Sequence, residues 1–533
     1  MDNFGIWSLL PPLVAIVLCI TTKQLIISLF LGAFAGAMVL SGCNPIAAFV
    51  ATLAYIVKSV ANDWNASILV FTMVLGGFIG LLGKSGAMQG LVKVVIRSVN
   101  TRIRGQLAAC LLSVLLFFDD YTSIILSGVV ARPVTDKLRI SREKLSYIVD
   151  SCGAGVAATA PVSNWTAYEV GVIGTVITAM GLTENAYMVF LSSIPYRFYC
   201  IFSVLFVFVI VLMGRDFGKM YVAERRAITT GEVFRPGSTP MAGLDEKEFS
   251  APEGTPMYAC NFFIPLATFF IVAFIGFFIT GGGFAKFAAK GLAGIMGAAD
   301  VINMMSVAIV VATMVLGVMM RIQKIMNVTQ ITDVWVNGMK AILFTIVFIV
   351  LAWTVAGFCK SLGTANYVVG ALVASNFPAW ILPSAVFIIA GTIAFATGSS
   401  WGTMALVLPL ALPAAVGLDA NFAATLGGVL TGATFGDHVS PISESVVMSS
   451  MSAACDHMDH VMTQVPYALT VCVISLIFGF IPAGLGIPVW MSIAAGTAAC
   501  LVFIRFVGKK TDYAVSSYAS EECSPLPKAN VGK

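Results

Sequence analysis

The sequence predicts an all-α polytopic membrane protein that consists of two inverted repeats. Three observations lead to this prediction: the composition, the distribution of basic residues, and the polar segments that interrupt apolar runs. Of the 533 residues, 59% are hydrophobic and only 11% are charged, whereas soluble domains carry about 25% charged residues. A spanning helix needs about 20 mostly apolar residues, and the chain has room for about 11 membrane-crossing helices. We also expect two re-entrant hairpins and helices that are broken at the membrane midplane.

The composition also excludes several classes of function. The net charge is only +4, and the basic residues lie in short segments between apolar runs, so we expect no nucleic-acid partner. The 11 cysteines are scattered without a CxxC or another metal-ligand spacing, which predicts that there is no transition-metal site. No nucleophile–base pairing and no phosphate-binding loop is found. The sequence therefore predicts no enzyme, no catalytic residue and no cofactor.

Basic residues gather in three stretches, which predict the orientation of the chain. The stretches are 84–104, 132–144 and the long hydrophilic loop from 215, and the positive-inside rule places all three in the cytoplasm. Counting crossings then puts the N-terminus outside and the C-terminus in the cytoplasm, for a multi-pass protein of the cell inner membrane. In this topology the basic residues on the outer side are Lys58, Arg197, Lys286, Lys290 and Lys360.

The segment 105–131 is expected to enter and leave the membrane on one side. It lies between two basic stretches and is too short for two full spans. A second segment, 381–417, contains no Lys or Arg and is interpreted as a hairpin that is entered from outside. Opposite entry of two related hairpins is typical of the inverted repeats found in transporters.

A single constant offset aligns the two halves of the chain. It superimposes Pro133 on Pro413, Pro161 on Pro441 and Ser163 on Ser443. The predicted organisation is a first transmembrane repeat, 1–214, with hairpin 105–131 and broken helix 145–181; a cytoplasmic loop, 215–256; a second transmembrane repeat, 257–485, with hairpin 381–417 and broken helix 421–458; a final transmembrane helix, 486–510; and a cytoplasmic tail, 511–533.

Four polar segments interrupt the apolar runs. Two are hairpin tips, 118–123 and 397–403, and two are breaks that contain proline, 160–166 and 436–445. Proline removes a backbone donor and opens a helix. Non-helical backbone at membrane depth is tolerated only where it is buried in protein or lines a wet cavity. Freed carbonyls and hydroxyls suit Na⁺, and the N-termini of half-helices attract anionic groups.

Carboxylates within these segments are the first candidates for function, because charge inside a membrane is costly. Paired carboxylates in a low dielectric cannot both stay ionised without a cation, so a proton and a metal ion compete for them. The predicted cation- and proton-binding residues are Asp119, Asp120, Asp437 and Glu444. Further predicted ligands for the cation or a substrate are Thr122, Ser123, Ser163, Asn164, Thr166, Ser399, Ser400, Thr403, His438, Ser440 and Ser443.

Several polar or aromatic residues have two open interpretations. Trp165 and Trp401 either wall a cavity or pack in the core, and His438 either carries protons or packs. Asp150 is either functional or the structural ion-pair partner of nearby Lys144, and Glu169 either is functional or caps a helix. His457 and His460 are expected to be solvated, near the inner end of a span.

At these segments the chain resembles the NhaC family of Na⁺/H⁺ antiporters, which belongs to the ion-transporter superfamily. The resemblance covers residues 70–490 and rests on the strings at 117–121, 140–145 with 150–151, 160–163, 397–403 and 435–443. It implies two inverted repeats with re-entrant hairpins, a scaffold beside a moving transport domain, elevator-like motion and a homodimer. Asn164 and Ser399 stand where the family more often has Thr. Both are polar, so ion ligation survives, whereas the ligand selectivity is open.

The leading functional prediction is Na⁺/H⁺ antiport by a secondary active transporter, with Na⁺ as the transported or coupling ion. The family that the chain resembles also has members that move organic acids and amino acids. The alternative is therefore Na⁺-coupled transport or exchange of a small organic acid or amino acid. The sequence shows no buried Arg or Lys to clamp a carboxylate, which counts against this alternative, although half-helix N-termini could serve instead. The expected partners are Na⁺, H⁺, the lipid bilayer and a second copy of the chain.

Overall fold

A computed structural model describes residues 4–22, 24–61, 63–87, 89–90, 99–240, 255–287, 295 and 299–511. Apart from a two-stranded antiparallel pairing of β1 (Arg215–Asp216) with β2 (Lys509–Lys510), the regular structure of these residues is helical. The predicted tail at 511–533 lies almost wholly outside the described residues, as does the stretch 241–254 of the predicted loop. The prediction of an all-α polytopic membrane protein is confirmed.

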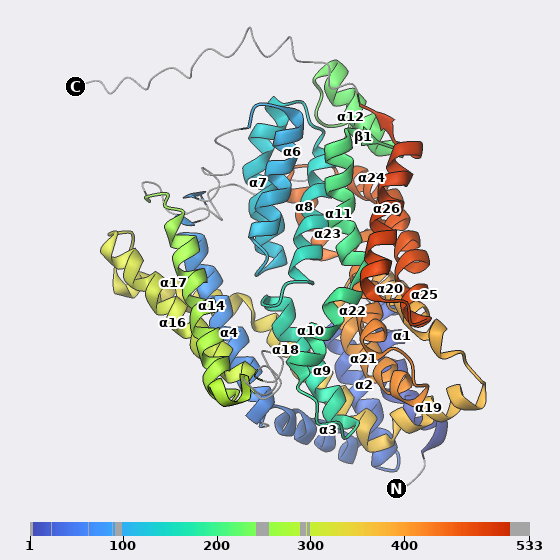
Figure 1. Ribbon diagram of the computed structural model, residues 1–533. Coiled ribbons are helices and arrows are strands. Elements are labelled where there is room, and N and C mark those ends of the chain that lie inside the picture. The colour runs from blue at the N-terminus through green and yellow to red at the C-terminus, as the bar shows by residue number, and fades with distance from the viewer. Residues whose placement is uncertain are drawn as a thin grey trace.

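The first half of the chain contributes the helices of the first repeat and, after them, α12 in the segment that was predicted as a loop (Figure 1). These are η1 (Gly5–Leu9), α1 (Leu10–Thr22), α2 (Leu25–Leu40), α3 (Pro45–Val60), α4 (Asp63–Lys84), α6 (Arg102–Leu115), α7 (Asp120–Lys137), α8 (Arg142–Ala157), α9 (Asn164–Ala179), α10 (Ala186–Ser193), η2 (Ile194–Tyr196), α11 (Phe198–Met213) and α12 (Gly218–Thr230).

The second half repeats the plan and adds the last helices. These are α14 (Cys260–Thr280), α16 (Val301–Ile322), α17 (Val328–Ala341), α18 (Leu343–Leu362), α19 (Thr364–Ala374), η3 (Ala379–Ile381), α20 (Leu382–Thr397), α21 (Ser400–Gly417), α22 (Phe422–Val439), α23 (Glu444–Ser452), α24 (His457–Ile474), the π-helical turn η4 (Ser475–Phe480), α25 (Ile481–Gly484) and α26 (Val489–Val507).

Among the described residues, seven helices are long and apolar enough to cross a membrane, or up to eight if the bent pair Ala186–Tyr196 and Phe198–Met213 counts as one span. Other expected crossings consist of pieces, because a break divides α8 from α9 and α22 from α23. The helices α3 and α19 were not predicted. Each is shorter than a full span, so it could not be recognised by the length of an apolar run.

The internal repeat is visible in the helix boundaries. Helices α20, α21, α22 and α23 start at one constant offset from α6, α7, α8 and α9. The matching first residues are Arg102 and Leu382, Asp120 and Ser400, Arg142 and Phe422, and Asn164 and Glu444. In Figure 1 the α6–α7 hairpin lies toward the top, and α20 and α21, which form the second hairpin, lie below it, so the two hairpins lie toward different ends of the molecule. A separate group of helices, α4, α14, α16 and α17, packs together at the left of Figure 1.

Glycines set the close packing of α20 against α22, which is the most extensive helix pair in the described part of the chain. Gly428, Gly432 and Gly436 recur once per turn on α22 and lie against the backbone of α20. A Cβ atom at Gly432 would overlap the carbonyl oxygen of Phe387, and one at Gly436 that of Gly391. Small residues let membrane helices approach this closely, so the second repeat is held together by backbone contact.

Ion pairs gather at the end of the molecule where α12 lies, at the top of Figure 1. The buried ammonium of Lys144 pairs with Asp216, and Arg226 of α12 pairs with Glu143 at 2.9 Å. The interpretation of Asp150 as the partner of Lys144 is therefore wrong. The first part of the loop forms a helix because its basic and acidic side chains find partners on the ends of the spans.

A second buried basic residue lies in the first repeat. The guanidinium of Arg197 pairs with Glu169 at 2.7 Å, and both side chains are fully buried. The expectation that the chain has no buried Arg or Lys is therefore wrong for Arg197 as well as for Lys144. It failed because hydropathy places a basic residue at a span end but cannot show that an acid on an earlier helix neutralises it.

Asp456 fixes the start of α24 beside this ion-pair region. Its carboxylate accepts the backbone N–H groups of Met458 and Asp459 at 3.0 and 3.1 Å and that of Thr239 at 3.0 Å. Partial burial opposes ionisation, but these donors outweigh it and hold the pKa of Asp456 below its ordinary value. The cap therefore stabilises the fold more strongly while the carboxyl group is ionised.

Replacing Gly432 with Ala should destabilise the protein, because the methyl group overlaps the α20 backbone. Overpacking of this kind costs about 1–3 kcal/mol, so the melting temperature in detergent should fall. The matched control is Gly370→Ala on α19, where a Cβ would meet nothing within 4 Å. Equal melting temperatures for the two variants would contradict the close packing.

Replacing Asp456 with Ala should lower the melting temperature near neutral pH. A depressed folded-state pKa means that the stabilisation is present above the unfolded value of about 3.9 and is lost as the pH falls through the folded value. The difference from the wild type should therefore shrink in acid. Asn421, a neutral cap that accepts the N–H of Ala424 at 3.0 Å, is the control. The effect of Asn421→Ala should not follow this pH dependence.

Candidate functional site

The first hairpin tip carries two buried aspartates where the chain turns from α6 into α7. Asp119 caps α7, and its carboxylate accepts the N–H of Thr122 at 2.8 Å and also the Thr122 hydroxyl. The amide of Asn164 donates to Asp119 at 2.6 Å and to Asp120 at 3.3 Å. A single amide from the broken helix therefore joins both carboxylates, which is one way to hold two like charges together.

The break between α8 and α9 is held by its own hydroxyl groups. Ser163 caps α9, accepts the N–H of Thr166 at 3.0 Å and donates to the Ala157 carbonyl at 2.8 Å. The Thr166 hydroxyl donates to the Ala160 carbonyl at 2.9 Å. These two hydroxyls already stabilise the opened backbone, and the same holds for Ser123, which donates to a carbonyl of α6 at 2.9 Å. The hydroxyl groups of Ser123, Ser163 and Thr166 therefore have a structural role, whether or not they also bind a cation.

The break between α22 and α23 surrounds Asp437 with hydroxyl groups. Ser443 and Ser445 donate to its carboxylate at 2.8 and 3.1 Å, and Asp437 is buried. Ser440 donates to the Phe395 carbonyl of α20 at 2.8 Å and thereby ties the break to the second hairpin. Ser445 was not predicted as a site residue, although its place in the same polar segment as Ser443 was a usable signal.

The second hairpin tip has no acid and turns on a glycine. Gly398 has a φ of +68°, and a Cβ there would lie 2.8 Å from the Ile442 carbonyl oxygen, so only glycine fits. Ser399 caps α21 by accepting the N–H of Gly402 at 3.3 Å. Thr403 donates to the Ser399 carbonyl at 2.9 Å, and Ser400 is buried at the first position of α21.

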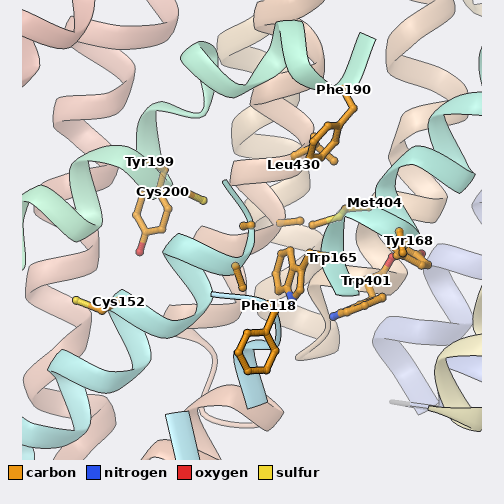
Figure 2. Close-up of a cluster of buried hydrophobic side chains, with 14 of the residues drawn as sticks. Phe118, Cys152, Trp165, Tyr168, Phe190, Tyr199, Cys200, Trp401, Met404 and Leu430 are labelled. Atoms are coloured by element: carbon orange, nitrogen blue, oxygen red, sulfur yellow. The ribbon is translucent and has the colours of Figure 1, made fainter. Parts of the chain in front are cut away.

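The four polar segments meet in space. Tyr121 of the first tip donates to Glu444 of the second break at 2.7 Å, and Tyr168 of α9 donates to the Trp401 carbonyl at 2.6 Å. The rings of Trp165 and Trp401 lie edge to face with centroids 5.7 Å apart. Figure 2 shows these aromatic residues gathered with Phe118. Both tryptophans therefore pack against the other repeat within the core.

The carboxylates form two centres, not one. Among the described residues, no group of three or more His, Cys, Asp or Glu is arranged to hold a metal ion. Asp119 and Asp120 share one centre, and Asp437 occupies the other within electrostatic range of Asp120. Glu444 is exposed at the first position of α23, so the expectation that it is buried is wrong. A helix N-terminus accommodates its charge without burial.

Sequence reasoning missed a further buried polar cluster beside Asp437. Gln464 of α24 donates to Asp150 of α8 and, at 2.8 Å, to the carbonyl of His438. The His438 ring is 3.1 Å from the hydroxyl of Tyr199. His460 is fully buried, so the expectation that it is solvated is wrong. The spacing of His460 and Gln464 by one helical turn places them on one helix face, which was the available signal.

Comparison with known proteins relates the chain to membrane antiporters. A model described as the Na⁺/H⁺ antiporter family matches residues 156–481. A protein of uncharacterised function from Haemophilus influenzae is 30% identical over 95% of this chain and 96% of its own length. Two relatives match only in part. An uncharacterised Na⁺/H⁺ antiporter of the same organism is 39% identical over 16% of this chain and 18% of its own length. The malate-2H⁺/Na⁺-lactate antiporter of Bacillus subtilis is 31% identical over 19% of this chain and 22% of its own length.

Two solved structures share the fold. The YdaH transporter of Alcanivorax borkumensis superimposes with a TM-score of 0.51 at 12% identity, covering 86% of this chain and 88% of its own. MtrF of Neisseria gonorrhoeae does so with a TM-score of 0.52 at 14% identity, covering 87% of this chain and 85% of its own. At these identities the likeness extends to the fold alone.

Proposed function

Because the chain belongs to the Na⁺/H⁺ antiporter family, we propose that this secondary transporter exchanges Na⁺ for H⁺ at the two carboxylate centres. The observation that carries the proposal is the amide of Asn164, which holds the buried carboxylates of Asp119 and Asp120 together. Two buried acids so close cannot both stay ionised without a cation. A bound Na⁺ favours the ionised pair, and protonation of one of the two carboxylates favours release of the Na⁺.

Asp437 supplies the second centre of the proposed exchange. Its carboxylate already accepts two hydroxyl donors, which leaves its remaining lone pairs as hard oxygen ligands. Ser443, Ser445 and the carbonyls freed at the break can complete a shell for Na⁺ without another charge. Because Asp437 is also within electrostatic range of Asp120, a cation bound at one centre changes the affinity of the other for protons.

The inverted repeat supports alternating access of the elevator type. The four polar segments come from broken helices and from hairpins that lie toward different ends of the molecule, and they would move together as a transport domain beside the group formed by α4, α14, α16 and α17. We place the protein in the cell inner membrane as a homodimer, with its N-terminus outside and the α12 end in the cytoplasm. The basic residues at the α12 end support this orientation.

A second candidate function is exchange or Na⁺-coupled transport of a small organic acid or amino acid. The partial match to a relative named as a malate-2H⁺/Na⁺-lactate antiporter favours it. Against it, the buried cations Arg197 and Lys144 are already neutralised by Glu169 and Asp216. Neither is free to clamp a substrate carboxylate, so an organic anion would depend on helix N-termini such as that of α23.

Replacing Asp437 with Asn should abolish Na⁺-dependent proton movement in everted vesicles, with a loss of at least about tenfold, because a neutral amide cannot alternate between a proton and a cation. The matched control is Asp333→Asn, which neutralises an exposed acid on α17 and should leave the rate unchanged. Wild-type exchange by Asp437→Asn would contradict the assignment.

A thermal-shift screen of the purified protein separates the two candidate functions. Na⁺ alone should raise the melting temperature by an amount that grows with the logarithm of its concentration above the dissociation constant, and organic acids and amino acids should add nothing. Stabilisation by one organic solute only in the presence of Na⁺ would favour the second candidate over Na⁺/H⁺ antiport.

A further inference from the structure

A polar cluster lies between Asp437 and the α12 end and takes no part in the proposed cation site. It consists of Asp150 on α8 with His460 and Gln464 on α24. All three side chains are fully buried. Charge and hydrogen-bonding groups at such a depth are costly and are retained where they serve a function.

The geometry orients the cluster around the Asp150 carboxylate. Gln464 donates to one of its oxygens, and the Nε2 atom of His460 lies 3.9 Å from the same oxygen. That nitrogen is also 3.0 Å from the Ser449 hydroxyl of α23. The carboxylate and the imidazole are therefore held in the range of an ion pair, on three helices that meet at the second break.

Several atoms of the cluster lack a partner among the described residues. Asp150 Oδ1, His460 Nδ1 and Gln464 Oε1 are buried without a hydrogen bond. An unmade hydrogen bond at a buried polar atom is costly, and native structures hold only a few such groups per 100 residues. Three of them in one cluster indicate that a small polar species visits it.

The chemistry of these atoms favours a proton over a metal ion. Na⁺ prefers a shell of oxygen ligands alone, whereas the ring nitrogens of His460 lie among the few oxygens of this cluster, and Asp150 is its one carboxylate. An imidazole that lies next to a carboxylate can instead take up a proton and release it again.

The cluster also has a route toward the molecular surface. Beyond Ser449, the neighbouring hydroxyl of Ser450 lies 3.2 Å from the Nδ1 atom of His457, and His457 is partly exposed at the start of α24. At the other end, Gln464 reaches the carbonyl of His438, which follows Asp437 in the chain. The polar groups therefore extend from the α12 end to the second carboxylate centre.

Other titratable groups surround the pair and set its charge. Those that interact with the pair electrostatically are Asp437 and His438 of α22, Tyr199 of α11 and His457 of α24. Only histidine among them titrates near neutral pH in its ordinary state.

We propose that Asp150 and His460 form a proton-carrying site that delivers protons between the α12 end and the Asp437 centre. The inference rests on the proposed Na⁺/H⁺ antiport. A proton taken up by neutral His460 makes an imidazolium that pairs with the Asp150 carboxylate. The proton then passes to Asp150, which leaves a neutral imidazole and a neutral acid. Transfer requires the 3.9 Å separation to shorten or one water molecule to bridge it.

Two assays on the full chain in proteoliposomes separate proton delivery from cation binding. Exchange of labelled Na⁺ for unlabelled Na⁺ at equal pH needs the cation site but no net proton movement. Na⁺-driven proton movement, followed with a pH-sensitive dye, needs both. Asp150→Asn should keep Na⁺/Na⁺ exchange within about twofold of the wild type and should lower Na⁺/H⁺ exchange at least about tenfold.

His460→Gln is the deciding variant if Asp150→Asn does not fold, because glutamine can keep the bond to Ser449. It should displace the pH profile of Na⁺/H⁺ exchange by about one unit toward acid, where protons are abundant without a carrier. The control, Ser492→Ala, removes another buried atom without a partner, on α26, and should behave as the wild type in both assays.

Unchanged Na⁺/H⁺ rates and pH profiles in both variants would overturn the inference. Equal loss of Na⁺/Na⁺ and Na⁺/H⁺ exchange in a folded variant would also overturn it, because the cluster would then belong to the cation site or to the scaffold. Wild-type protein that moves Na⁺ without protons would instead refute the proposed antiport itself, and the inference with it.

Discussion

Polar groups that lie within an apolar protein must find partners in the protein itself, and the breaks in the helices depend on this constraint. Each break frees carbonyl and amide groups that have no water to bind. The first break is closed by Ser163 and Thr166, which bond back to α8 and its end. The second is closed by Ser440, which bonds to α20. The residues that could bind a cation are therefore the same residues that keep the opened helices intact.

This double role explains the chemical inequality of the two halves. At the first tip the carboxylate of Asp119 accepts a backbone N–H group at the start of α7. At the second tip the hydroxyl of Ser399 does the same for α21 at the equivalent position. The acid of the second half appears instead on the break, as Asp437. One repeat plan therefore presents two centres of different charge, and a neutral amide, Asn164, belongs only to the first.

Periodic and local features of the fold could be predicted from the sequence. The constant offset between the halves follows from matching prolines and polar tips, and it recurs in the starts of four helix pairs. Pairings across long distances in the chain could not be predicted. Lys144 finds Asp216, and Asp150 finds Gln464, 314 residues away. Hydropathy indicates that burying each of these side chains is unfavourable, but it cannot show which partner offsets that free energy.

The glycine face of α22 has a mechanical consequence. Gly432 and Gly436 lie directly on the α20 backbone, and at these positions no side chain separates the two helices. The pair therefore behaves as a single rigid rod that carries the second hairpin and the Asp437 carboxylate together. Bending has to be concentrated in the short joints at 418–421 and 440–443, where helical hydrogen bonding is interrupted.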